Sequence, residues 1–245
     1  MVLSAIAVVA GSFWLAQKRG VPAKKIVLIL LVMLVAAFVG ARILNILVDW
    51  ELYFANPQRI FALGFSGFSL FGGGLLAASA GFFLAKRLQV DPWQLGDAVA
   101  PFLGLGIALM RLGCFLNGCC FGKITDRPWG VRFPALSSAH ISQLSHGQTG
   151  LLTVQPVHPT QIYELVGALI ASAIAVYILQ KKYRAGTAIL AFIIFFTAVR
   201  WINYAFFRVM PDTFDASPFF YPLLYAGIIA VSLVLLVKRN RRYGF

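Results

Sequence analysis

Seven long runs of apolar residues, separated by short polar segments, dominate the chain. A helix that crosses a bilayer needs roughly 17–25 consecutive apolar residues, and most of these runs reach that length. The pattern therefore predicts an all-α, polytopic membrane protein with about seven transmembrane helices, of which the first is short. The expected spans are approximately Val2–Ala16, Ile26–Val48, Phe68–Ala85, Ala98–Phe115, Ile162–Leu179, Thr187–Phe207 and Tyr221–Val237.

The composition agrees with this pattern. Of 245 residues, 60% are hydrophobic and 12% are charged, which is far more apolar than a typical soluble domain. The mean hydropathy is +0.83. No internal repeat or low-complexity linker divides the chain, so we expect one integral membrane domain over residues 1–245, with an outer-side loop region at about 122–161. The first apolar run has no cations before it, and we interpret it as an uncleaved helix rather than a secretory signal.

The basic residues fall after alternate apolar runs, which gives the chain a predicted orientation. Because cytoplasmic loops carry the excess of lysine and arginine, we expect the N-terminus outside and the C-terminus in the cytoplasm. The net charge is +13, but the basic residues do not form a stripe interleaved with aromatic residues. We therefore expect no nucleic-acid partner. The thirteen residues on the predicted cytoplasmic side are Lys18, Arg19, Lys24, Lys25, Lys86, Arg87, Lys181, Lys182, Arg184, Lys238, Arg239, Arg241 and Arg242.

Two arginines, Arg111 and Arg200, interrupt predicted membrane spans. A guanidinium stays charged and is costly in hydrocarbon, so such a residue is expected to face a protein-lined cavity. Its chemistry suits a negatively charged ligand. We therefore predict an anion-binding site at these two residues.

Glycines cluster at the start of the third span, in the segment Phe65–Gly74, which includes Gly73 and Gly74. A glycine-rich helix start can present free N–H groups to a phosphate. Small residues also let membrane helices pack closely, and on these residues alone close packing is the preferred interpretation.

Three cysteines, Cys114, Cys119 and Cys120, follow one another on the outer side of the fourth span. A disulfide from Cys114 to either of the others and a catalytic thiol beside Arg111 are both open. The preferred interpretation is that they are small packing residues. A metal site on these thiols, completed by a histidine at His158, His140 or His146, is a further alternative. Because the chain has neither a CxxC pair nor paired histidines, we expect no metal site.

Several motifs together resemble the prolipoprotein diacylglyceryl transferase family. The resemblance rests on R-L-G-C-F-L-N-G-C-C-F-G at Arg111–Gly122, W-G-V-R-F-P at Trp129–Pro134 and H-P-T-Q-I-Y-E at His158–Glu164, with shorter matches at Gly40–Arg42, Gly73–Leu75 and Arg200. It implies a multi-pass enzyme of the bacterial cytoplasmic (inner) membrane. Such an enzyme transfers the diacylglyceryl group of phosphatidylglycerol to a lipobox cysteine thiol of a precursor protein and releases glycerol phosphate, without a metal or other cofactor.

The resemblance also implies roles for individual residues. Arg111 and Arg200 correspond to essential arginines, which would hold the lipid phosphate and stabilise the charge that develops on it. Two roles are open for His158 and Glu164: they take part in proton transfer, or they fix the loop and pair with an arginine such as Arg111 or Arg42, and the second is the preferred interpretation. Tyr163 is expected to be an interface anchor rather than an acid. The residues expected to contribute to substrate binding are Arg42, Gly73, Gly74, Asn117, Gly122, His158 and Glu164.

The chain departs from the family pattern at five positions. Gly72 stands where the family has a histidine or tyrosine, Cys114 replaces an asparagine, and Cys119 and Tyr204 replace acidic residues; Phe196 replaces a tyrosine. These changes affect polar support and proton transfer more than phosphate binding. Two alternatives therefore stay open: a divergent relative that uses the same phospholipid with another acceptor, and a non-enzymatic phospholipid-binding or transport protein.

Overall fold

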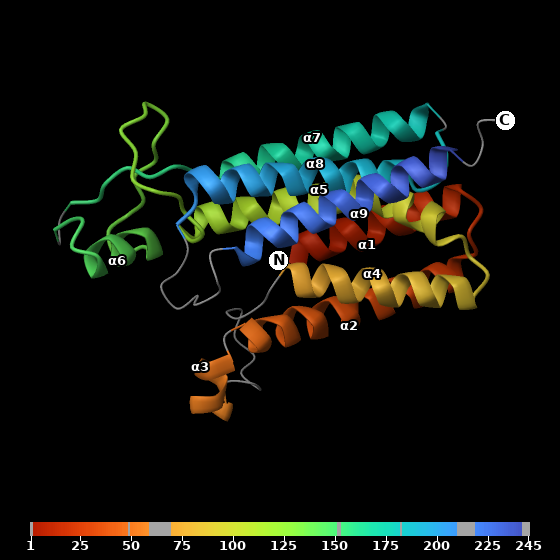
Figure 1. The fold of residues 1–245 in the computed structure, drawn as a ribbon, viewed down its shortest axis with the longest axis horizontal. Coiled ribbons are helices and arrows are strands. Elements are labelled where there is room, and N and C mark those ends of the chain that lie inside the picture. Colours follow the sequence, from red (N-terminus) through yellow and green to blue (C-terminus); the bar gives the residue numbers. More distant parts are fainter. Residues whose placement is uncertain are drawn as a thin grey trace.

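The long helices lie side by side along one axis in the computed structural model, which describes residues 2–48, 50–58, 70–150, 153–181, 183–209 and 219–241 (Figure 1). Within these ranges the structure contains isolated β-bridges but no named strand, which confirms the all-α fold class. The long helices are α1 (Val2–Lys18), α2 (Ala23–Val48), α4 (Leu70–Arg87), α5 (Pro92–Leu116), α7 (Thr160–Gln180), α8 (Thr187–Ile202) and α9 (Phe220–Arg241).

Five helical segments of the described chain are long and apolar enough to cross a membrane, namely α2, α5, α7, α9 and α8 together with its continuation. That continuation is a π-helical turn, η2 (Asn203–Phe207). Helix α1 has 17 residues and α4 has 18, and their crossing stays a prediction. Helix α5 begins six residues before the expected Ala98, because the side chain of Asp91 accepts from the backbone N–H of Trp93 and Pro92 suits the first helical position.

Helices α1, α4, α7 and α9 all end at one end of the bundle, where the C-terminus also lies (Figure 1). The last turns of α1 and α4 carry Lys18, Lys86 and Arg87. The opposite end carries the short helices α3 (Trp50–Ala55) and α6 (Ser138–Ser145). Successive long helices thus run in opposite directions, and the cationic helix ends come together at one end of the bundle, as the charge pattern of the sequence predicts. Two of the thirteen expected cations, Lys182 and Arg242, lie outside the described residues.

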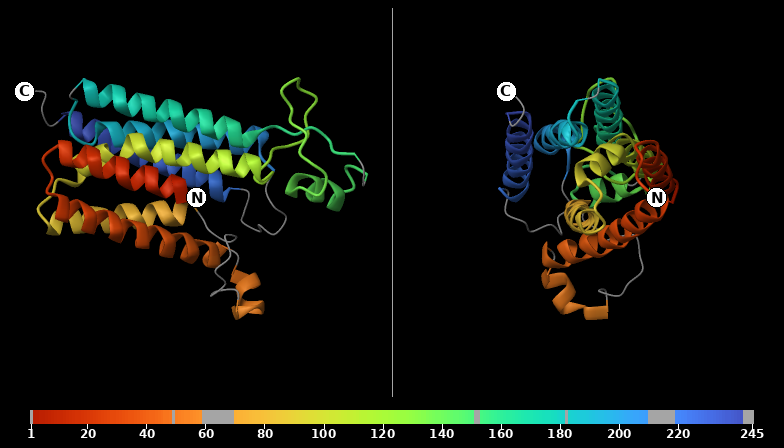
Figure 2. Two further views of the ribbon diagram at one scale, coloured as in Figure 1. Left: turned by 180° about the vertical axis from the view of Figure 1, so that it is seen from behind. Right: turned by 90° about the vertical axis from the view of Figure 1, so that its right-hand side faces the viewer.

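Helices α2 and α4 form a pair that packs mainly on itself, at one side of the remaining helices (Figure 2). The backbones approach closely at Gly40 and Gly72, where a Cβ on either residue would collide with the carbonyl oxygen of the other. A Cβ on Gly73 would lie 2.8 Å from the carbonyl oxygen of Ala37, whereas Gly74 has nothing within 4 Å. These contacts support the close-packing interpretation. The expected glycine segment also includes residues 65–69, which are outside the described ranges.

Helix α5 is the centre of the second group, where it contacts α1, α7 and α8, and α9 packs on α8. The buried carboxylate of Asp97 accepts from the backbone N–H groups of Gly186 at 2.8 Å and Ile189 at 3.0 Å. Asp97 thus satisfies amides at the start of α8 that have no partner within that helix. This contact fixes α8, and the arginine near its end, relative to α5.

A small lobe follows α5 and is closed by backbone pairing of Val157 with Val131 and Ile124. Its core contains Phe133 and Ala139, and Ser137 caps α6 by accepting from the N–H of His140. The lobe lies on the end of the bundle at which α5 ends and α7 begins. This arrangement places the segment after α5 directly against the first turn of α7.

Candidate active site

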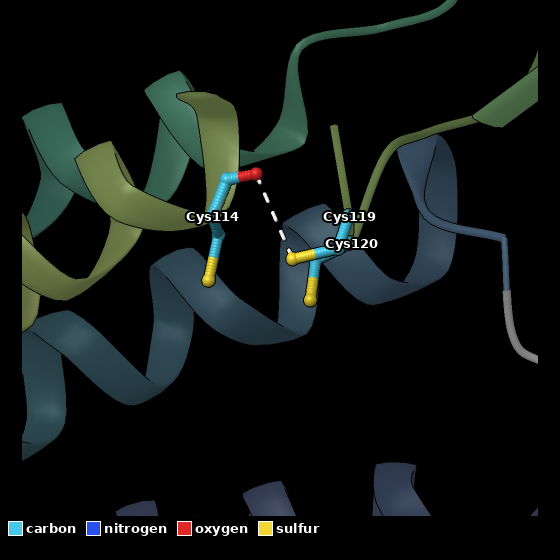
Figure 3. A group of neighbouring side chains, drawn as sticks. All are labelled: Cys114, Cys119 and Cys120. Atoms are coloured by element: carbon cyan, nitrogen blue, oxygen red, sulfur yellow. Dashed lines mark hydrogen bonds between the residues drawn. The ribbon is translucent and has the colours of Figure 1, made fainter. Parts of the chain in front are cut away.

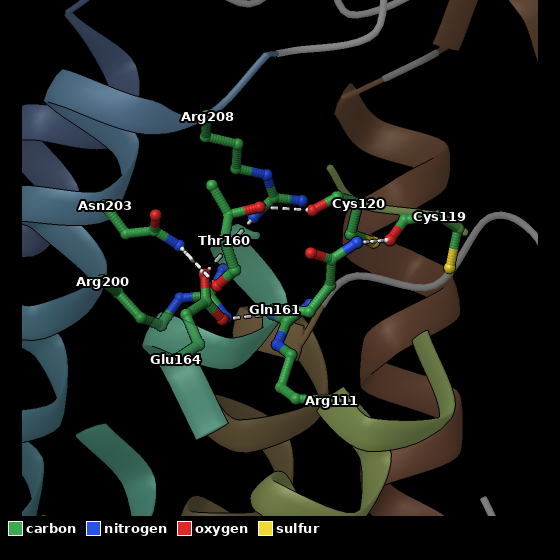
Figure 4. A network of polar contacts seen from close by, with 9 residues as sticks. All are labelled: Arg111, Cys119, Cys120, Thr160, Gln161, Glu164, Arg200, Asn203 and Arg208. Carbon is green, nitrogen blue, oxygen red and sulfur yellow. Dashed lines mark hydrogen bonds and ion pairs between the residues drawn. The ribbon is translucent and has the colours of Figure 1, made fainter. Parts of the chain in front are cut away.

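The carboxylate of Glu164 is shared by three arginines from three separate segments (Figure 4). Arg111 of α5 places an Nη atom 2.6 Å from Glu164 Oε2, and Arg200 of α8 places one 3.2 Å from the same oxygen. Arg208, which follows η2, lies 3.9 Å from Oε1. Glu164 is in the first turns of α7 and only 2% exposed. The structure therefore brings three of the expected site residues, Arg111, Arg200 and Glu164, into one buried cluster.

Asn203 is the fourth residue whose side chain contacts the Glu164 carboxylate directly. Its Nδ2 donates to Glu164 Oε1 at 2.8 Å and to the carbonyl oxygen of Thr160 at 3.3 Å. Asn203 is the first residue of the π-helical turn η2, a type of irregularity that often occurs at functional sites. The turn directs a neutral donor at a carboxylate that already accepts from cations.

The cluster carries excess positive charge in a buried setting. Three guanidinium groups and one carboxylate leave a formal charge of +2, while Arg111 is 6% and Arg200 7% exposed. The buried Nε atoms of Arg111 and Arg208 have no hydrogen-bond partner among the residues that the structure describes. Because buried charge is costly without compensation, this arrangement is suited to an anionic ligand such as a phosphate.

Cys114 lies in the last turns of α5, and Cys119 and Cys120 lie on the tight turn that follows this helix; we call the segment Cys114–Cys120 the cysteine turn (Figure 3). Asn117 ends the helix, and Gly118 adopts a left-handed conformation with φ of +65°, which glycine tolerates without strain. The backbone N–H of Cys119 then donates to the carbonyl oxygen of Cys114 at 3.1 Å. The three sulfur atoms lie within 4.8 Å of one another, and all three thiols are free and half-buried.

This turn is attached to the same helix that carries Glu164 (Figure 4). Gln161 Nε2 donates to the carbonyl oxygen of Cys119 at 2.6 Å, and Thr160 Oγ1 donates to that of Cys120, also at 2.6 Å. A hydrogen bond with the Cys114 thiol and the charges of Arg208 and Arg111 lower the pKa of the Cys120 thiol, despite its burial. The cysteine turn and the arginine cluster are therefore neighbours.

His158 and Tyr163 form a second polar group beside the cluster. His158 Nδ1 lies 3.0 Å from the Tyr163 hydroxyl, which also accepts from Trp129 Nε1 at 3.0 Å. Burial, with the charges of Arg127 and Lys123, lowers the pKa of His158 below its usual 6.5. The imidazole is therefore neutral at pH 7. Of the two expected partners for arginine, Glu164 forms ion pairs, whereas the contact found for His158 is with Tyr163.

The remaining expected site residues occupy two places. Asn117 is the C-cap of α5, and the N–H of Gly122 donates to the carbonyl oxygen of His158 at 2.9 Å, so both lie in the lobe segment near the cluster. Arg42, by contrast, is on α2, where its guanidinium lies 5.5 Å from the ring centre of Tyr53. Gly73 and Gly74 are on α4, within the α2–α4 pair. That these three contact substrate stays a prediction.

Sequence reasoning missed four residues that build the site: Thr160, Gln161, Asn203 and Arg208. Two of them belong to the His158–Glu164 motif, which could have suggested their involvement. Arg208 directly follows an apolar run, so its position resembled an ordinary interfacial cation. Only the course of the chain through η2 directs it back to Glu164.

Two of the residues that depart from the family pattern are packed among aromatic rings. Phe196 stacks on Phe192 with ring centres 5.9 Å apart. The ring of Tyr204 lies 5.3 Å from that of Tyr221 and 6.0 Å from that of Tyr225, both on α9. These positions therefore contribute to helix packing in this chain.

A comparison with protein families matches the model of prolipoprotein diacylglyceryl transferase to residues 1–238. The chain belongs to the prolipoprotein diacylglyceryl transferase family. The match extends over almost the whole helical bundle, and the matched residues include every residue of the arginine cluster.

Three relatives of the family illustrate the degree of similarity, and each is named phosphatidylglycerol–prolipoprotein diacylglyceryl transferase. The protein of Polynucleobacter necessarius is 35% identical over 132 residues, which are 54% of this chain and 44% of that relative. The protein of Synechococcus elongatus is 28% identical over 195 residues, 80% of this chain and 64% of the relative. The Nostoc protein is 30% identical over 214 residues, which are 82% of this chain and 71% of that relative. The matched part of the chain thus spans between 44% and 71% of the length of these relatives.

Proposed function

We propose that this protein transfers the diacylglyceryl group of phosphatidylglycerol to the lipobox cysteine thiol of precursor proteins, and that Arg111 and Arg200 hold the lipid phosphate during the transfer. Membership of the family and the names of its relatives support the substrate and the reaction. The protein acts in the bacterial cytoplasmic membrane, which it crosses with seven helices, its N-terminus outside and its C-terminus in the cytoplasm.

The observation that carries the role of the arginines is the unequal charge of the buried cluster. One carboxylate cannot neutralise three guanidinium groups, and Glu164 already forms ion pairs with all of them and accepts a hydrogen bond from Asn203. A phosphodiester would supply one negative charge and two free oxygens, which match the fork of a guanidinium. Binding of phosphatidylglycerol would therefore lower the formal charge of the cluster from +2 to +1.

The same geometry suits the transfer step. The thiol sulfur attacks the glyceryl carbon next to the phosphate, a C–S bond forms, the C–O bond breaks, and both electrons of that bond leave with the phosphate oxygen. Negative charge increases on the departing glycerol phosphate, and fixed guanidinium groups in a water-poor site stabilise it. The thiol proton leaves as the bond forms. The neutral imidazole of His158 is our candidate for its acceptor.

The position of the cluster agrees with transfer at the outer leaflet. Glu164 is near the start of α7 and Arg200 near the end of α8, so both lie toward the end of the bundle that carries the lobe. The helix ends rich in lysine and arginine are at the opposite end. With those ends in the cytoplasm, the arginines would face the compartment into which precursor proteins are secreted.

Mass spectrometry of the reaction products tests the proposal. Purified protein is incubated with phosphatidylglycerol and a lipobox peptide, and we expect a thioether-linked diacylglyceryl peptide together with free glycerol phosphate. Arg111→Ala and Arg200→Ala should lower the rate by roughly 10²–10³-fold, the usual cost of removing one donor that stabilises transition-state charge. Arg87→Ala is the matched control, because Arg87 is an exposed cation at the C-terminal end of α4, far from the cluster. Full activity of Arg200→Ala would refute the phosphate clamp, and no product from the unmodified protein would refute the reaction.

A divergent reaction with another acceptor is a second candidate, and the packing at Gly72 favours it. The family pattern has a histidine or tyrosine at this position, but a side chain here would collide with the backbone of α2. The chain therefore does without that group. In the same assay, release of glycerol phosphate without modification of the lipobox peptide would identify this case. Saturable lipid binding with no release at all would identify a non-enzymatic lipid-binding protein.

A further inference from the structure

The cysteine turn at the end of α5 has a geometry that the proposed transfer reaction does not use. The sulfur atoms of Cys114, Cys119 and Cys120 converge to within 4.8 Å of one another, although they come from a single stretch of seven residues (Figure 3). Among the described residues, no histidine or carboxylate side chain joins the three sulfur atoms as a further possible metal ligand. We propose that these three thiols bind one soft d¹⁰ metal ion, Zn(II) or Cu(I), as thiolates.

The sulfur positions are close to those that a metal requires. Sulfur atoms bound to one zinc ion at about 2.3 Å in tetrahedral geometry are about 3.8 Å apart. The cluster therefore needs to contract by no more than about 1 Å, which side-chain rotation on the turn can supply. A disulfide, in contrast, requires two of the sulfur atoms to approach to about 2 Å.

The backbone of the turn is fixed before any ion binds. Cys120 has φ of +60°, a left-handed conformation that is unfavourable for a residue with a side chain and costs roughly 1–2 kcal/mol. The turn holds it there through the hydrogen bond from Cys119 N to Cys114 O and the donors of Thr160 and Gln161 on α7. The strained residue aims its sulfur at the other two. Such preorganisation lowers the entropy that ion binding would otherwise cost.

Charge and access also suit a thiolate site. Three thiolates and one ion have a net charge of −1 with Zn(II) or −2 with Cu(I), and the positive charges of Arg111 and Arg208 act on the cluster. Thiolates are the ligands that Cu(I) and zinc favour among protein side chains. As the metal–sulfur bonds form, the three thiol protons leave to solvent. The three cysteines are half-buried rather than fully buried, so an ion can reach them from outside.

The test is metal binding by the purified, reduced, full-length protein in detergent. Zn(II) is titrated against a chromophoric chelator, Cu(I) is titrated against its own chelator without oxygen, and elemental analysis gives the stoichiometry. We expect one ion per chain. Each of Cys114→Ser, Cys119→Ser and Cys120→Ser should weaken binding by more than the roughly 10–100-fold that loss of an outer-shell partner costs. Leu116→Ala, which alters a 78% exposed side chain on the same turn, should leave binding unchanged.

Further readouts separate the proposal from its alternatives. The triple serine variant removes every cysteine in the chain and defines the background. Metal added to the unmodified protein should slow alkylation of all three thiols together, which tests the site even where a serine variant does not fold. Binding no stronger than the triple-serine background would overturn the proposal, as would protection of fewer than three thiols. None of these measurements depends on transferase activity.

Discussion

Glu164→Gln removes the one negative charge from the arginine cluster and is the sharpest test of how that cluster is held. The carboxylate accepts at 2.6 and 3.2 Å from Arg111 and Arg200, and at 2.8 Å from Asn203, with Arg208 at 3.9 Å. A glutamine side chain has one amide nitrogen in place of an oxygen. In either orientation that nitrogen faces donors, so the variant loses both a charge and an acceptor.

The size of the effect follows from the geometry. Two unit charges 4 Å apart attract by about 4 kcal/mol at an effective dielectric constant of 20, and Glu164 has three such partners. The desolvation of four buried ions offsets much of this sum, and removal of one partner from a buried pair typically costs about 3–5 kcal/mol. For a chain of this size, such a loss lowers the melting temperature by roughly 6–20 °C.

Thermal unfolding in detergent, with Asp126→Asn as the control, measures this prediction. Asp126 is an exposed acid of the lobe, so its substitution makes the same change in net charge without touching the cluster. Because Glu164→Gln raises the formal charge of the cluster to +3, inorganic phosphate should raise its melting temperature more than that of the unmodified protein. If Glu164→Gln melts within about 2 °C of Asp126→Asn and shows no greater response to phosphate, the cluster does not depend on its carboxylate.

Three further predictions test other parts of the structure. Gly72→Ala should separate α2 from α4 and lower the melting temperature by several degrees, whereas Gly74→Ala, with open space around it, should be neutral or slightly stabilising; equal stability of the two would contradict the close packing. Asp97→Ala should speed hydrogen exchange of the two amides it holds at the start of α8 and cost about 1–3 kcal/mol, and unchanged exchange would argue against this cap. Because the pKa of His158 is lowered below 6.5 in the folded state, the unfolded state binds its proton first, and stability is lost as the pH falls below 6.5. The loss of melting temperature between pH 7.5 and 5.5 should therefore be smaller in His158→Gln than in the control His146→Gln, and equal losses would refute the shift.

The helices were predictable because lipid-spanning segments must be long and apolar, and the ends of α2, α7, α8 with η2, and α9 fall within three or four residues of the expected spans. The start of α5 could not be predicted in this way, because the N-cap at Asp91 makes the helix begin before the apolar run. Helices α3 and α6, with six and eight residues, are too short to produce a periodic signal. The sequence thus predicts the elements that the membrane constrains.

Part of the site was predictable for the same reason. Arg111 and Arg200 are costly in a membrane, which marks them as functional, and the acid of the H-P-T-Q-I-Y-E motif was expected to pair with an arginine. The sharing of Glu164 by a third arginine was not predictable. Arg208 reaches it only because η2 replaces the last α-helical turn before it, and sequence patterns give little indication of π-helical turns.

The thiol cluster and the arginine cluster are connected through the first turn of α7, which links the two proposals physically. Gln161 and Thr160 hold the carbonyl groups of the cysteine turn, and Glu164 follows within one helical turn of both. An ion that draws the sulfur atoms closer together would displace these carbonyl groups, and with them the backbone of α7 that positions the Glu164 carboxylate. Because Glu164 Oε2 accepts from Arg111 at 2.6 Å and from Arg200 at 3.2 Å, displacements of a few tenths of an ångström would redistribute its contacts between the two arginines. Metal occupancy should therefore change the affinity for the lipid phosphate, and by thermodynamic linkage the lipid should change the affinity for the metal by the same factor.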